Sequence, residues 1–153
     1  MSGRKSLAVQ QSFNVLAGAA TVCNGMFLLL RRSARESFLP NAWGIPAGQV
    51  NFNEDVADAS LRELTEETGL EGEVASLIGY SSFRSERNSV QLANVQLNFL
   101  VLTRHNKVKL DLANHSAHSW ISLDDIENPL LDSFTKSILA ETRLCYKELP
   151  AVR

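Results

Sequence analysis

Cysteine is scarce in this chain of 153 residues, which has only Cys23 and Cys145, far apart and in apolar surroundings. This usage predicts two buried free thiols in a reducing compartment and no disulfide scaffold. Long apolar runs are also missing, and Gln10, Gln11 and Asn14 interrupt the only segment that could begin a signal peptide. We therefore expect a cytoplasmic protein with no membrane partner.

An excess of positive charge is absent as well. Lysine and arginine number 15 against 17 aspartates and glutamates, the net charge is −2, and the basic residues are scattered. A polymeric nucleic acid is therefore not an expected partner. The chain has no repeat, low-complexity tract or linker, and 44% of its residues are hydrophobic. These features predict one domain over residues 1–153, with a core from about residue 13 to 149.

The segment from residue 48 to 70, GQVNFNEDVADASLRELTEETGL, carries the most informative pattern. It predicts a helix from about Glu54 to Thr68, with Asn53 as the N-cap and Gly69 as the left-handed stop. Small and apolar residues recur at intervals of three and four and predict a face that packs on a sheet. They are Ala57, Ser60, Leu61, Leu64 and Thr68.

Three carboxylates lie beside that apolar face. At about 100° per residue, Glu63, Glu66 and Glu67 fall within roughly a third of the helix circumference. Such carboxylates repel one another unless a cation neutralises them, and their hard oxygen atoms suit Mg²⁺, or Mn²⁺ in its place. The alternative is a solvated acidic helix face, which is the usual explanation of a charge run.

The whole segment resembles the signature of the Nudix hydrolases, Gly-x5-Glu-x7-Arg-Glu-U-x-Glu-Glu-x-Gly-U with U aliphatic, and matches it without a gap. The resemblance to this MutT-like family implies an α/β (α+β) fold, an α/β/α sandwich with a mixed central sheet. It implies metal ligation by the carbonyl of Gly48 and by Glu63, Glu66 and Glu67. Arg62 would hold a glutamate in ligand geometry, and Glu54 would serve structure or a secondary metal.

The rest of the chain predicts mostly strands. Residues 13–22 and 26–30 flank Asn24-Gly25, which is typical of a hairpin turn. Residues 39–45 lead into the signature, and residues 73–81, 90–103 and 116–122 read as further strands, with a possible bulge at Ala93-Asn94. Residues 129–149 predict a second helix. Ser85 to Asn88 would then lie in an exposed loop.

One departure concerns the catalytic base. Many Nudix hydrolases have Glu-His a few residues before a tryptophan, whereas this chain has Asn114-His115 before Trp120. An amide cannot take a proton from water. The base would then be Glu63, or come from another loop as Glu86 or Asp111.

The resemblance implies hydrolysis of the phosphoanhydride in a nucleoside diphosphate linked to a further group X, by water attack at phosphorus. Nucleoside triphosphates and nucleotide sugars both remain open as substrates. Phe83, Arg84, Arg87 and His115 are weaker candidates for substrate binding. The sequence leaves open two alternative functions: a catalytically silent nucleotide-binding or regulatory module, and an interaction scaffold. It also leaves open a homodimer.

Overall fold

A computed structural model describes residues 10–150. Its strands are β1 (Gln11–Cys23), β2 (Met26–Arg32), β3 (Trp43–Gly44), β4 (Ala47–Gln49), β5 (Gly72–Arg87), β6 (Val90–Thr103) and β7 (His115–Ser122). The helices are α1 (Val56–Thr68) and α2 (Ser133–Glu148). No helix in residues 10–150 is long and apolar enough to cross a membrane.

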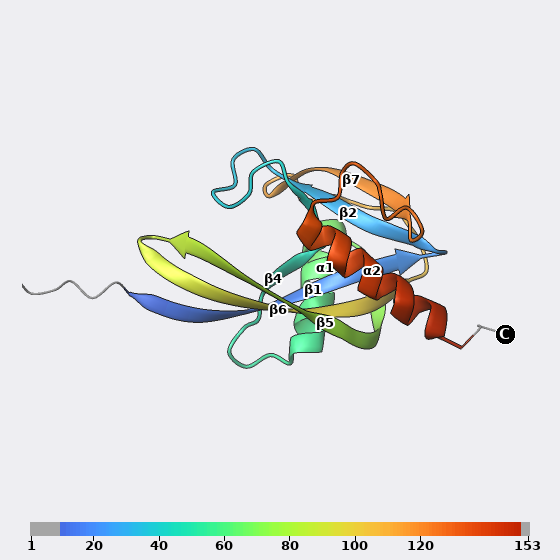
Figure 1. The fold of residues 1–153 in the computed structure, drawn as a ribbon, viewed down its shortest axis with the longest axis horizontal. Helices are drawn as coiled ribbons and strands as arrows, with labels where there is room; N and C mark the ends of the chain where they lie inside the picture. Colours follow the sequence, from blue (N-terminus) through green and yellow to red (C-terminus); the bar gives the residue numbers. More distant parts are fainter. Residues whose placement is uncertain (1–9, 151–153) are drawn as a thin grey trace, which may run out of the picture.

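The central sheet is mixed and opens into two wings. Its order is β3-β2-β1-β6-β5, with β7 added beside β2 and β4 beside β1. Strands β1 and β2 pair at the hairpin, Val22 with Phe27 and Cys23 with Met26, and then diverge (Figure 1). β4 pairs with β1 from Leu16 to Gly18, and so brings the loop before α1 to the middle of the sheet. The expected α+β sandwich with a mixed sheet is confirmed.

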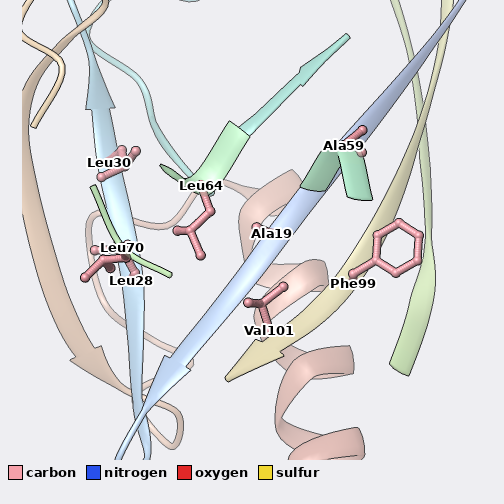
Figure 2. Close-up of a cluster of buried hydrophobic side chains, with 9 residues drawn as sticks. Ala19, Leu28, Leu30, Ala59, Leu64, Leu70, Phe99 and Val101 are labelled. Atoms are coloured by element: carbon pink, nitrogen blue, oxygen red, sulfur yellow. The ribbon is translucent and has the colours of Figure 1, made fainter. Parts of the chain in front are cut away.

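Two apolar clusters hold the layers together, one on each side of the sheet. Under α1, the buried Leu64 packs with Leu28, Leu30, Phe99 and Val101 (Figure 2). Under α2, Ile138 and Leu139 belong to the second buried cluster. At about 25 cal/mol per Å² of buried apolar surface, such clusters fix the position of α1 on the sheet. The carboxylates of α1 are therefore carried by a rigid helix.

Local signals are well reproduced at turns. Asn24 and Gly25 both have positive φ angles, 49° and 75°, as the hairpin predicts. Gly69 ends α1 with φ 70° and donates its N–H to the carbonyl of Thr65. The N-cap is Asp55 and not Asn53, because the Asp55 side chain accepts from the N–H groups of Ala57 and Asp58. The helix therefore begins at Val56.

Several element boundaries were predicted wrongly. β5 runs on to Arg87, so the segment expected to be a loop continues the strand, and the turn lies at Asn88-Ser89. β6 pairs regularly through residues 93 and 94, and the register shifts lie in β5, between Val74 and Ser76 and between Leu77 and Gly79. Of residues 39–45, only β3 is a strand, and α2 begins at Ser133 after an Asp132 cap. Cys23 and Cys145 are free thiols, but only Cys23 is fully buried.

Candidate functional site

Gly48 and Glu63 meet where β4 passes the middle of α1. A side chain at position 48 would overlap the Glu63 carboxyl carbon and Oε1, and even Oε2 would lie only 2.5 Å from the added Cβ. The bare backbone at Gly48 is thus what admits the Glu63 carboxylate to this position. The structure brings together these two residues of the sequence prediction.

Arg62 links three carboxylates with the loop. Its Nε donates to Glu54 Oε2 at 2.7 Å, and its Nη1 donates to Glu63 Oε1 at 2.9 Å and to Glu66 Oε2 at 3.1 Å. Its Nη2 donates to the carbonyl of Gln49 at 2.9 Å. The Arg62 hydrogen bond lowers the pKa of Glu54, whereas burial raises the pKa of Glu63 despite the same partner. Arg62 therefore orients Glu54, Glu63 and Glu66 as a group.

Glu67 faces the loop without a hydrogen-bonded cation among residues 10–150. Its Oε2 accepts from the backbone N–H of Ala47 at 3.3 Å. Burial raises the pKa of Glu67 well above its usual range, and the charge of Glu63 raises it further. The hydrogen bond from Ala47 and then the charge of Arg32 lower the pKa of Glu67, but by less than burial raises it. Glu67 and Glu63 are thus two partly buried carboxylates whose charge the protein neutralises incompletely.

These donors fit a hard divalent cation, because they are carboxylate oxygens in a site with uncompensated negative charge. Within the described residues, no group of three or more histidine, cysteine, aspartate or glutamate side chains is already gathered for a metal ion. Glu66 is exposed and turned to Arg62, so it does not join Glu67. A divalent ion would thus compete with Arg62 for Glu63 and Glu66.

Asn114 lies beside one of the alternative bases. Its Nδ2 donates to Asp111 Oδ2 at 2.7 Å, and this bond lowers the pKa of Asp111. The backbone N–H of Asp111 donates to the carbonyl of Glu67, which ties this loop to α1. Glu86, the other alternative, is exposed near the end of β5. Of the two, Asp111 is the one that the backbone anchors to the carboxylate site.

A cavity of about 500 Å³ adjoins the carboxylates through Ala47. Three of the four predicted substrate-binding residues line it: Phe83, Arg87 and His115. Arg84 does not line it and borders a separate depression beside Phe13. A substrate-binding role for Arg84 therefore stays a prediction.

Aromatic rings form one wall of the cavity. Phe38 and Phe83 stack with centroids 5.4 Å apart at 20°, and Phe134 meets Phe83 edge-on at 5.6 Å. The guanidinium of Arg32 lies 5.7 Å above the Phe38 ring. Sequence reasoning missed Phe38, Phe134 and Arg32, since Phe83 lies far from all three in the sequence and no local spacing relates them to it.

His115 is buried at the cavity with a free polar atom. It is 7% exposed, and its Nδ1 has no hydrogen-bond partner among the described residues. Burial, and then the charge of Arg32, lowers the pKa of His115. An unpaired buried nitrogen costs free energy, and Nδ1 itself is shielded from solvent in this structure.

Comparison with known proteins agrees with this geometry. A family model described as NUDIX domain matches residues 13–142. The m7GpppN-mRNA hydrolase of Xenopus laevis is 40% identical over 76 residues, covering 46% of this chain and 26% of that protein. The asymmetrical bis(5'-nucleosyl)-tetraphosphatase of Rattus norvegicus is 33% identical over 86 residues, covering 54% of this chain and 57% of that protein. The matches thus span less than two thirds of either relative.

Among solved structures, the MutT NUDIX hydrolase from Burkholderia pseudomallei is similar to this chain with a TM-score of 0.70 and 29% identity. The match covers 85% of this chain and 98% of that one.

Proposed function

Because the chain belongs to the NUDIX domain family, we propose that it is a metal-dependent pyrophosphohydrolase acting on a nucleoside diphosphate linked to a group X. The observation that carries the proposal is the placement of Glu63 and Glu67 against the Gly48 loop, next to a cavity of nucleotide size. The cleaved bond is a phosphoanhydride, and water attacks phosphorus. The substrate types to test are nucleoside triphosphates, nucleotide sugars and, because of the tetraphosphatase relative, dinucleoside polyphosphates.

In this proposal, Glu63, Glu66, Glu67 and the carbonyl of Gly48 hold Mg²⁺, or Mn²⁺ as a substitute. The bound ion supplies charge neutralisation of the diphosphate and activation of water. Glu63 also removes the proton of the attacking water, and the raised pKa that burial gives this carboxylate suits a general base. Arg62 positions Glu63, while Glu54 serves structure or a secondary ion.

The substrate lies in the cavity with its base toward the aromatic wall and its phosphates toward Ala47. Phe83 can stack on a flat base, and Arg87 and His115 offer polar contacts to the rest of the nucleotide. The named activities of the relatives, on a capped mRNA end and on a bis(5'-nucleosyl) tetraphosphate, support a phosphoanhydride as the target. We propose a small nucleotide as substrate, with no nucleic-acid polymer or membrane as partner, a cytoplasmic location and, as a further possibility to test, a homodimer.

The decisive experiment measures phosphate release from a panel of nucleoside triphosphates, dinucleoside polyphosphates and nucleotide sugars. We expect turnover of at least one substrate with Mg²⁺ and none with EDTA. Glu63→Gln and Glu67→Gln should each lower kcat by at least about a hundredfold, as expected for a lost base or metal ligand. Near wild-type turnover in both folded variants would refute the assignment.

The same panel decides the alternative. A nucleotide-binding module without turnover would bind members of the panel and release no phosphate from any of them. The paired carboxylates argue against this alternative, since a pure binder gains nothing from two partly buried glutamates beside Gly48.

A further inference from the structure

Strand β6 buries three amide side chains where a core strand would carry apolar ones. Asn94, Gln96 and Asn98 are 3%, 5% and 0% exposed, and they alternate along the strand on one face. Asn94 and Gln96 line the 500 Å³ cavity. Burying an amide costs free energy unless the amide is hydrogen-bonded, so each of these three side chains needs hydrogen-bond partners.

The amides are joined in two short chains with the same direction. In the outer chain, Asn14 Nδ2 donates to Asn94 Oδ1 at 3.0 Å, and Asn94 Nδ2 donates to Ser85 Oγ at 2.8 Å. In the inner chain, Gln96 Nε2 donates to Asn98 Oδ1 at 2.8 Å, and Asn98 Nδ2 donates to Ser81 Oγ at 3.1 Å. In both chains the amino groups donate toward β5.

The first amide of each chain is left with an open carbonyl oxygen. Asn14 Oδ1 and Gln96 Oε1 accept no hydrogen bond from any residue between 10 and 150, and both side chains line the cavity. Gly18 leaves room for this arrangement, since a Cβ there would come within 2.9 Å of Gln96 Nε2 and 2.6 Å of Asn98 Oδ1. The cavity therefore presents two acceptors whose orientation the amide chains fix.

We propose that Gln96 Oε1 and Asn14 Oδ1 select a nucleobase that carries an exocyclic amino group. This inference rests on the proposed function and names the substrate class of the same cavity. The amino groups at C6 of adenine, C4 of cytosine and C2 of guanine can donate to these oxygens. Hypoxanthine and uracil have an oxo group at the first two of these positions, and hypoxanthine has only a hydrogen atom at C2. An oxo group would repel a carbonyl oxygen, and a C–H group would not replace the lost amino donor, so the acceptors would stay unpaired.

The test is equilibrium binding of nucleoside monophosphates to the full chain, followed by the fluorescence of Trp43, which lines the cavity. Monophosphates contain no phosphoanhydride, so binding is measured whether or not the protein is a hydrolase. The matched pairs are GMP with IMP, AMP with IMP, and CMP with UMP. In at least one pair, the amino-bearing member should bind about ten to a hundred times more tightly, the scale of one unpaired buried polar group.

Gln96→Leu removes the acceptor at similar size and should reduce that preference to within about threefold, and Asn14→Ala serves if the first variant does not fold. Gln91→Leu is the matched control, because Gln91 is exposed on the same strand and outside the amide chains. In this variant the preference for the amino-bearing base should persist. Equal binding in every pair, tighter binding of the oxo members, an unchanged preference in both variants, or no binding at all would overturn the proposal. Loss of phosphate release with the preference intact would instead refute only the proposed activity.

Discussion

Adding one methyl group at Gly48 should separate activity from stability. In Gly48→Ala, the new Cβ would lie 2.5 Å from Glu63 Oε2 and closer still to the carboxyl carbon, whereas ordinary contacts begin at 3.4 Å. The Glu63 carboxylate must then retreat by about 1 Å, and a misplacement of that size costs roughly a hundredfold in rate. Because the displaced atoms are the end of a flexible side chain, the free energy of unfolding should fall by less than about 1 kcal/mol.

The measurements are kcat for Mg²⁺-dependent phosphate release and the urea midpoint of unfolding. Gly25→Ala is the control for turnover, because it adds the same methyl group in the turn between β1 and β2, outside the cavity and with no atom within 4 Å. Its turnover should stay within about threefold of wild type. Wild-type turnover in Gly48→Ala would refute the argument, and so would a loss of several kcal/mol in stability.

Three further predictions concern the core, the base and the buried histidine. Leu64→Ala should lower the free energy of unfolding by about 2 to 5 kcal/mol, because Leu64 is 0% exposed; an unchanged urea midpoint would contradict its place in the core. Asn114→Ala should reduce kcat much less than Glu63→Gln, since an amide accepts no proton; the reverse order would reassign the base. Burial lowers the pKa of His115 in the folded protein below the 6.5 of the unfolded chain. As the pH falls below 6.5, the unfolded state therefore binds more protons than the folded state, and the stability present above pH 6.5 is lost. His115→Gln should therefore lose less stability than wild type between about pH 7.5 and 5.5, and an equal loss would show that the imidazole does not set the pH response.

Local interactions made helix α1 and the turn between β1 and β2 predictable from the sequence. The Asn24-Gly25 turn, the Gly69 stop and the apolar face with Leu64 each depend on residues within a few positions, and the structure has all three. The N-cap was missed by two residues because Asn53 and Asp55 are both good caps, and only the backbone decides between them.

The features that could not be predicted from the sequence depend on contacts between residues far apart in the chain. Asn94, Gln96 and Asn98 look like the solvent side of an alternating strand, and they are buried because β1 and β5 flank them. The same pairing carries β5 on to Arg87. Phe38 meets Phe83 across 45 positions, a contact that no local pattern encodes.

The parallel pairing of β1 with β6 also bears on how the molecule is made. It joins Gln11 with Gln91 and continues to Val22 with Leu102, so each bond closes a loop of about 80 residues. On the ribosome, β1 and α1 emerge well before β6, the strand that pairs with β1, has been synthesised. Assembly of the sheet must therefore wait for β6, and we expect slower folding than in a helical domain of this size, with the apolar strand β1 exposed to other chains in the interval.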